Sequence, residues 1–460
     1  MVNLQLTKTK IISLQFSKGD WNGFLTLLTD NLAKIVLLPM ILMGTFQFAP
    51  ELVFGRILPG MGMALLVGLG IFTYQGRKLA KIEGRSDVTA LSYGISTPVM
   101  FVYLFAIMAP VYFAGKDPLP AYQIGLGAAF LSGLIKMSGA LVGPWLERVI
   151  PRAGLLGTIA GVAIVWIAMV PCAIIFTNPI IGLPVLFVLL LGFIGRYQFP
   201  FRLPAGLVAI GVGVLLGLIT GDTAINFENT GFYPPVPVIG DLWVGLQLIW
   251  SKPALFAILI PIEIYNFIEA ISNVKSAQTA GDNYNVRTSV WADGLGTGVG
   301  ALFGSPFPTT IYLGHPAYKQ MGARTNYAVA TGFLLWFASL MGLFAFLQHF
   351  IPAAGVAPLL VFVGIVMCQY AFQSTPKYGA AIAIALVPHI ADLLKKQLDG
   401  TLSEVLQQAP VTAELASSLA QNQGVYFQSY GFLSQGAIIT SLLWGSIVAL
   451  IIDGDLRRAT

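Results

Sequence analysis

Long apolar runs, separated by short polar stretches, recur from one end of the chain to the other. A helix that crosses a membrane needs roughly 20 predominantly apolar residues. The pattern predicts fourteen spanning or half-spanning segments, approximately at 22–48, 56–75, 92–115, 121–142, 152–176, 181–196, 204–221, 253–275, 288–304, 307–321, 326–349, 354–373, 377–395 and 431–452. We therefore expect an all-α polytopic membrane protein.

The composition supports this expectation. Hydrophobic residues make up 56% of the 460 residues and charged residues only 10%, whereas soluble domains carry about 25% charged residues. The two cysteines, Cys172 and Cys368, lie in apolar segments, so we interpret them as small core residues and not as a disulfide.

The positive charge follows the expected topology. If the N-terminus is cytoplasmic, eighteen of the 25 lysine and arginine residues lie on the cytoplasmic side, five lie outside and two, Lys34 and Lys136, lie inside spans. Cytoplasmic loops of membrane proteins carry such an excess. We expect both termini in the cytoplasm, a bacterial-type cell inner membrane, and anionic lipid as the partner of the net charge of +5. The charge gives no reason to expect nucleic acid.

Two segments depart from helical patterning at matching places. "TALSYGISTP" (89–98) opens the third segment and "GSPFPTTIYLGHP" (304–316) opens the tenth, which is third in the second set of seven. Short Gly/Pro-interrupted segments at corresponding positions of two halves are typical of an inverted-repeat transporter with its site near the membrane midplane. We expect repeats at 1–221 and 253–460, an outer loop at 222–252, and substrate contacts from Tyr93 and Ser96. The alternative is two packing segments without a substrate role.

Several ionisable residues lie inside predicted spans, where each costs a few kcal/mol. Asp30 and Lys34 are four residues apart, so they share a helix face and are expected to form a structural pair. Lys136 either pairs with a carboxylate or extends to an interface. Asp293 is expected near a helix start, where capping and function are equally good explanations.

The eighth segment, "IEIYNFIEAISNVKSA" (262–277), gathers polar groups in one span. Glu263, Asn266 and Asn273 are spaced by three and seven residues and lie on one stripe. Glu269 lies roughly 120° around the helix from Glu263. The asparagines could serve only to hold helices together, whereas Glu263 is the stronger candidate for function because an amide would do that at a lower desolvation cost.

Other kinds of chemistry find little support in the sequence. It contains no His/Cys cluster with metal-ligand spacing, no phosphate-binding loop and no convincing catalytic triad. We therefore expect neither an enzyme nor a metal or organic cofactor, and only H⁺ or Na⁺ as a coupling ion. A channel remains an alternative, which counterflow would distinguish from a carrier.

Three stretches carry a family resemblance: the eighth segment, "WADGLGTGVGALFGSPFPTT" (291–310) and "GARTNYAVATG" (322–332). Together they resemble the nucleobase–cation symporter-2 family of xanthine, uracil and purine permeases, which are related to ascorbate transporters. The resemblance is clearest over 253–375 and includes "ISTPVMF" (95–101). It implies fourteen segments in two inverted repeats of seven, with core and gate domains each drawn from both repeats. It also implies a short strand plus a helix in segments three and ten, and a possible homodimer.

The resemblance also implies a site. The family's substrate-binding acid on segment eight falls on Glu263, and Asn266 falls where azaguanine-type purine permeases carry a second acid. A family acid on segment ten falls on Gly314, so this acid is missing. Either His315 beside it replaces the acid in part, so that both positions contact the substrate, or the substrate is of another kind.

We expect nucleobase transport by alternating access, with Glu263 as the principal substrate or proton ligand and Glu269 as a secondary coupling candidate. The alternative is an inorganic-anion or bicarbonate transporter of the same fold. The missing acid favours this alternative and the retained Glu263 disfavours it.

Overall fold

The computed structural model describes residues 16–44, 46–149, 152–200, 203–408, 414, 418, 427–434 and 436–459. The N-terminus, predicted to be cytoplasmic, lies outside these residues. Within them, seven helices are long and apolar enough to cross a membrane, and a pair bent by 90° at 341–342 makes an eighth. Three shorter apolar helices, Pro179–Phe193, Ala205–Thr220 and Ala437–Ile452, add to these. The prediction of an α-helical polytopic membrane protein is confirmed.

Helices and strands lie at all fourteen predicted segments. The first seven segments are formed by α1 (Lys18–Gly44); α2 (Pro50–Leu52), η1 (Val53–Ile57) and α3 (Leu58–Glu83); β1 (Tyr93–Ile95), α4 (Thr97–Val102), η2 (Tyr103–Met108) and α5 (Ala109–Gly115); α6 (Pro118–Val149); α7 (Arg152–Val162), η3 (Ala163–Met169) and α8 (Val170–Thr177); α9 (Pro179–Phe193); and α10 (Ala205–Thr220).

The second seven follow a connecting helix, α11 (Ile239–Ser251). They are formed by η5 (Pro253–Leu255) and α12 (Phe256–Thr279); α13 (Val286–Leu302); β2 (Thr309–Ile311) and α14 (His315–Gln320); α15 (Asn326–Leu340) and α16 (Leu343–Phe350); α17 (Ala353–Ser374); η6 (Pro376–Tyr378) and α18 (Gly379–Gln408); and α20 (Phe427–Ser434) and α21 (Ala437–Ile452), before the short α22 (Leu456–Ala459).

Prolines explain the three π-helical turns of the first half. The turns η1, η2 and η3 each end two residues before a proline, at Pro59, Pro110 and Pro171. A proline has no N–H to donate, and its ring clashes with the carbonyl four residues earlier. In each case that carbonyl lies within the π turn, whose wider spacing relieves the clash. The spans therefore continue through their prolines.

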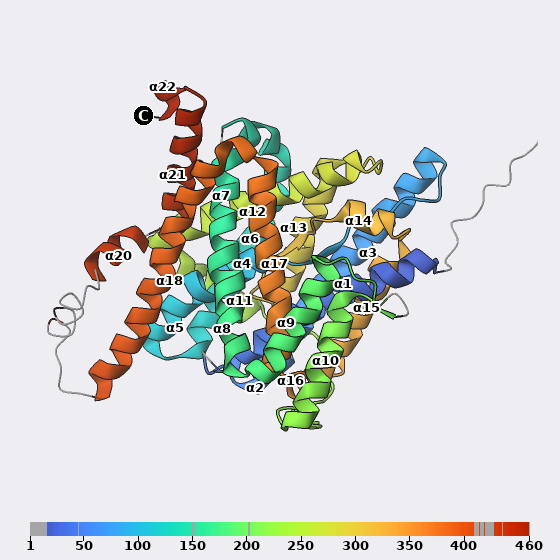
Figure 1. Cartoon of the computed structure of the whole chain (residues 1–460), viewed down its shortest axis with the longest axis horizontal. Coiled ribbons are helices and arrows are strands. Elements are labelled where there is room, and N and C mark those ends of the chain that lie inside the picture. The colour runs from blue at the N-terminus through green and yellow to red at the C-terminus, as the bar shows by residue number, and fades with distance from the viewer. Residues whose placement is uncertain are drawn as a thin grey trace, which may run out of the picture.

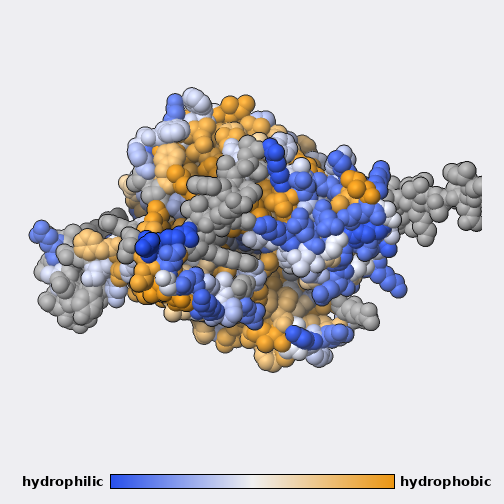
Figure 2. Space-filling model, turned by 90° about the horizontal axis from the view of Figure 1, so that it is seen from above, coloured by the Kyte–Doolittle hydropathy of each residue, from blue (hydrophilic) through white to orange (hydrophobic). Residues whose placement is uncertain are grey.

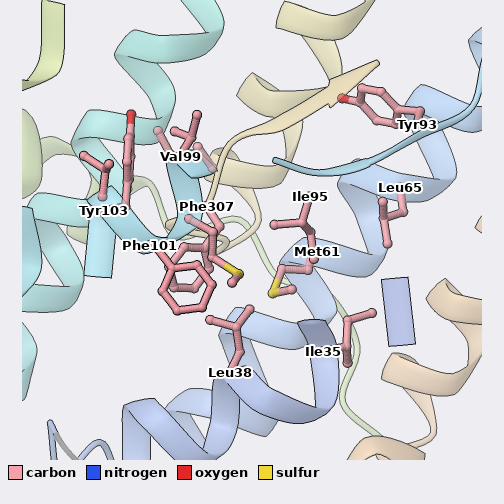
Figure 3. Close-up of a cluster of buried hydrophobic side chains, with 14 of the residues drawn as sticks. Ile35, Leu38, Met61, Leu65, Tyr93, Ile95, Val99, Phe101, Tyr103 and Phe307 are labelled. Carbon is pink, nitrogen blue, oxygen red and sulfur yellow. The ribbon is translucent and has the colours of Figure 1, made fainter. Parts of the chain in front are cut away.

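The two interrupted segments meet in an antiparallel pair of strands, with Tyr93 opposite Ile311, Gly94 opposite Thr310 and Ile95 opposite Thr309. This confirms the strand-plus-helix form expected for segments three and ten. Gly94 is required here because a Cβ would lie 2.0 Å from the Tyr312 hydroxyl. In Figure 3 the side chains of Tyr93 and Ile95 lie among the buried apolar side chains contributed by several helices.

The helices pack as two groups on either side of this crossing. The first helical group contains α1, α3, α6, α12, α13 and α15, and the second contains α7 to α10, α17, α18 and α21. Figure 1 labels the helices of both groups. Each group draws helices from both halves of the chain, so packing between segments far apart in sequence holds the fold together. The repeat boundaries at 1–221 and 253–460 stay a prediction.

The surface carries broad hydrophobic areas (Figure 2). On α9 and α10, large apolar side chains such as Phe187 and Ile219 are exposed. Extended apolar patches are unfavourable in water and suit contact with lipid acyl chains.

The segment predicted as an outer loop, 222–252, contains α11 in its second half, and its place on the outer side stays a prediction. This helix packs on α6, where the Asp241 carboxylate accepts hydrogen bonds from the Gln123 amide at 2.9 Å and the Arg56 guanidinium at 2.7 Å. A Cβ at Gly245 would lie 1.9 Å from the Gln123 carbonyl oxygen. Gly245 therefore allows the backbone of α11 to approach the backbone of α6 closely, which the composition alone did not indicate.

Replacing Gly245 with alanine is expected to lower the thermal unfolding midpoint, because the methyl group would push α11 away from α6. Overpacking of this kind costs about 1–3 kcal/mol. Gly240→Ala, in the same helix, is the matched control: its Cβ would meet nothing within 4 Å. Alanine is the better helix former, so the control should leave the midpoint unchanged or raise it. Equal midpoints for the two variants in detergent would contradict the packing argument.

Candidate functional site

A cavity of about 710 Å³ lies beside the strand crossing, between the two helical groups. One wall comes from α1, α4, α12, β2 and α14, and the other from α7, α9, α10 and α17. The cavity extends to Asn22, Met321 and Tyr370, at the end of the molecule where α1 begins. Most of the lining is apolar, and its main polar groups are Asp30, Lys34, Tyr265, Glu269, Asn273, Thr310 and Tyr312.

Glu269 presents unused hydrogen-bonding capacity at this cavity. Among the described residues its Oε2 atom is buried without a hydrogen-bond partner within 3.5 Å, as are the hydroxyls of Tyr265 and Thr310. The Tyr265 hydroxyl and the Glu269 carboxylate nevertheless lie close enough to interact with each other. Buried polar groups almost always find partners. Three unpartnered groups from α12 and β2 beside one cavity therefore mark a place where a polar ligand can bind.

Asp30 and Lys34 form the expected pair, with the Lys34 ammonium 2.5 Å from the Asp30 carboxylate. Lys34 also donates a hydrogen bond of 2.6 Å to the Tyr312 hydroxyl, which in turn donates to Asn31 at 3.1 Å. The pair is thus confirmed and also lines the cavity. Because the two charges of this pair offset each other, Glu269 is the remaining acidic group of this wall.

Glu263 lies away from the cavity lining. Its side chain is fully buried, and its carboxylate accepts hydrogen bonds from Tyr103 on η2 at 2.8 Å and from Ser132 on α6. The Asn266 amide lies 3.5 Å from the same carboxylate. The two acids of α12 therefore face different environments, as their angular separation predicted, but Glu269 and not Glu263 faces the cavity.

Lys136 pairs with a carboxylate, which decides between the two interpretations left open by the sequence. Its ammonium lies 3.2 Å from Asp293 Oδ1 and donates to the main-chain carbonyl of Thr309, and both charged side chains are fully buried. Asp293 lies well inside α13 and does not cap it. The side chain of Asn285 is the N-cap and accepts from the Thr288 N–H.

The remaining predicted contacts fall in different places. Gly314 lines the cavity and has a φ of 110°, a conformation that favours glycine. Tyr93 is buried behind the crossing and donates to the main-chain carbonyl of Asp293 at 3.2 Å. Ser96 is buried outside the lining, and its hydroxyl has no partner among the described residues. His315 faces Asp282 at 2.8 Å, away from the cavity.

Sequence reasoning missed Tyr265, Thr310 and Tyr312. A signal existed for Tyr265, which precedes Glu269 by four residues and so shares its helix face. Side chains alternate along a strand, which places Thr310 on the face opposite Thr309 and Ile311. The sequence did not say which face would border a cavity.

Asp282, in the loop after α12, connects the loop that leads into segment three with α14 of segment ten. Its fully buried carboxylate accepts hydrogen bonds from Lys319 at 2.6 Å, Arg85 at 2.7 Å and the Thr89 N–H at 3.2 Å, besides His315. Burial alone would raise the pKa of Asp282, but these donors outweigh it and lower the pKa from 3.8 to about 2.

The lowered pKa of Asp282 predicts a pH-dependent contribution to stability. The contribution is fully present above the unfolded-state pKa of about 3.9 and is lost as the pH falls toward 2. Asp282→Asn should lower the unfolding midpoint at pH 6, and about half of that difference should remain near pH 3. Thermal unfolding of both proteins across this range is the measurement. A difference that is independent of pH would contradict the charged role of Asp282.

The helical groups, the crossed strands and the cavity between them define an α-helical membrane transporter with the inverted-repeat fold. The model of the xanthine/uracil permeases, described as "Permease family", matches residues 87–375, more than half of the chain. The chain therefore belongs to this family of nucleobase and ascorbate transporters.

Two solved structures share the fold. The transmembrane domain of a cyanobacterium bicarbonate transporter, BicA, is 16% identical with a TM-score of 0.55, covering 92% of this chain and 96% of that one. The structure of SLC26A9 is 13% identical with a TM-score of 0.51, covering 78% of this chain and 66% of that one. At these identities the likeness shows the fold alone. A search of curated proteins found no match.

Proposed function

We propose that the protein is a secondary active transporter that carries a nucleobase of the xanthine, uracil or purine type by alternating access. The observation that carries the proposal is the unpartnered carboxylate oxygen of Glu269 at the cavity beside the crossed strands. A carboxylate accepts the N–H groups on the edge of a base. The hydroxyls of Tyr265 and Thr310 supply further polar contacts, and the apolar walls suit the ring faces.

Glu269 takes the role that the family resemblance suggested for Glu263. Both carboxylate oxygens of Glu263 already accept hydrogen bonds from protein groups, so a substrate would have to displace them. The oxygen of Glu269 needs no such exchange. We therefore assign the principal substrate contact to Glu269 and place Gly314 among the cavity contacts.

The position of the cavity supports alternating access. Its walls belong to two helical groups, so movement of one group against the other would open the cavity to either side in turn. With the charge-based orientation, the cavity now extends toward the cytoplasm, which is an inward-facing state. We place the protein in a bacterial-type cell inner membrane with both termini in the cytoplasm, and the homodimer stays a prediction.

An inorganic anion is the less suitable substrate. The carboxylate of Glu269 would repel it, and the nearby Lys34 is already engaged by Asp30 at 2.5 Å. The likeness to a bicarbonate transporter concerns the fold, which does not set the substrate.

Ligand-induced thermal stabilisation of the purified protein tests the proposal. Xanthine, uracil, adenine and guanine are compared with bicarbonate and sulfate at several pH values, because a ligand that binds the folded state raises the unfolding midpoint. We expect at least one base to give a saturable rise and the anions to give none. The reverse result would overturn the nucleobase assignment. Counterflow of the labelled base in proteoliposomes then separates a carrier from a channel, which shows none.

A further inference from the structure

Behind the strand crossing, a buried lysine that does not line the cavity contacts two oxygen atoms, one from a carboxylate and one from the main chain. The Lys136 ammonium donates to the Thr309 carbonyl and lies 3.2 Å from Asp293 Oδ1. The Thr297 hydroxyl bonds the Thr309 hydroxyl at 2.8 Å and its carbonyl at 3.3 Å. The Tyr93 hydroxyl contacts the same threonine hydroxyl. None of these residues lines the cavity.

This is the type of position in which transporters bind a coupling cation. Where a spanning helix is interrupted, the carbonyls of the unwound backbone are available to coordinate Na⁺ or to take part in proton coupling. Thr309 is the first residue of β2, within the interrupted tenth segment. Its carbonyl is directed to the ammonium of Lys136, which therefore occupies the place where a free cation would bind.

The charge of Lys136 is also shared by several acids. It acts on Asp293, Glu263 and Glu269, which come from two helices. The other buried lysine of the described residues, Lys34, has its own counter-ion in Asp30. Without Lys136, Asp293 and Glu263 would lose the positive charge that acts on them inside the protein, which is strongly unfavourable. Glu269 would still have Lys34 nearby.

We propose that Lys136 is a built-in substitute for the coupling cation, so that the native protein needs no Na⁺ to bind its substrate. Removing the side chain while leaving its space empty would convert the position into a site for a small monovalent cation. The functional meaning of this inference rests on the proposed transport activity, but the cation site can be tested without any substrate.

The test is thermal unfolding of the substrate-free protein in detergent at constant ionic strength, with choline chloride replaced stepwise by sodium chloride or methylammonium chloride. Choline is too large for the space left by one side chain. Lys136→Ala should show a saturable rise in its unfolding midpoint with sodium or methylammonium. The native protein and Lys136→Met, which fills the space without charge, should show no difference among the three salts.

Two results would overturn the inference: a saturable rise with sodium in the native protein, or no rise with either small cation in Lys136→Ala. If Lys136→Ala cannot be recovered folded, the test uses the native protein and Lys136→Arg, which retains the charge. The measurement is then the Na⁺ dependence of substrate binding by these two proteins. Substrate binding by either protein that requires Na⁺ over choline would refute the proposal. A failure of nucleobases to bind would leave the salt experiment unaffected, so the two proposals fail separately.

Discussion

Glu269→Gln is expected to weaken binding of the nucleobase by at least about 100-fold while the protein remains folded. Hydrogen bonds to a charged acceptor contribute about 1.5–3 kcal/mol each, and a base edge offers the carboxylate up to two N–H donors. The glutamine retains the shape of the side chain but loses the charge and one acceptor. Equilibrium binding of the labelled base, compared with the native protein, is the measurement.

The Glu269 experiment has an internal check on folding. Because Oε2 of Glu269 has no hydrogen-bond partner among the described residues, and because glutamine keeps the shape of the side chain without a buried charge, the substitution should cost the substrate-free protein little. Its unfolding midpoint should therefore equal or exceed that of the native protein. Glu51→Gln, the same exchange at an exposed residue of α2, should change neither binding nor stability. Native-like affinity in Glu269→Gln would remove the basis of the proposed site.

Glu263→Ala is expected to have the opposite effect, a loss of stability of about 3 kcal/mol with binding by the folded protein retained within a few-fold. The substitution leaves the buried hydroxyls of Tyr103 and Ser132 without their acceptor and removes a carboxylate that balances Lys136. Breaking a buried charged arrangement at one partner costs about 3–5 kcal/mol. Thermal unfolding and equilibrium binding on the same preparation measure the two effects.

Two milder variants control for the cause of the Glu263 effect. Glu263→Gln keeps an acceptor for the hydroxyls and should lie between the native protein and Glu263→Ala in stability. Tyr103→Phe removes one donor and should cost about 1 kcal/mol. A Glu263→Ala protein that is as stable as the native one but no longer binds the base would show that Glu263 is the substrate ligand, as the resemblance implied.

The eighth segment shows how far sequence reasoning reached. The polar residues within an otherwise apolar span indicated that α12 is functional. Their spacing predicted that Glu263 and Glu269 lie on different faces of this helix. The spacing did not say which face would border the cavity. The rotation of α12 about its axis depends on Tyr103 and Ser132, which lie more than 130 residues earlier in the chain.

Other contacts of the site also fall into those that the sequence predicted and those that only the structure showed. The Asp30–Lys34 pair was predictable because both residues lie on one helix face four positions apart. The Lys136–Asp293 pair was not predictable, because the two residues lie 157 positions apart in sequence and on different helices. From the sequence, Lys136 could equally have extended to an interface and Asp293 could equally have capped a helix. For Asn273 the sequence left open a structural and a functional role, and its amide donates to the Ile311 carbonyl of β2 at 2.7 Å while the residue also lines the cavity.

The sequence by itself determined that this is a polytopic membrane protein with interrupted third and tenth segments, because apolar run length and Gly/Pro content are local properties of the chain. Only the tertiary structure decided that β1 and β2 pair, that α11 packs on α6, and that Glu269 faces the cavity while Lys136 lies behind it. Each of these depends on surfaces contributed by segments far apart in the chain. Their fit is set by packing and charge in three dimensions, which periodicity along one segment cannot specify.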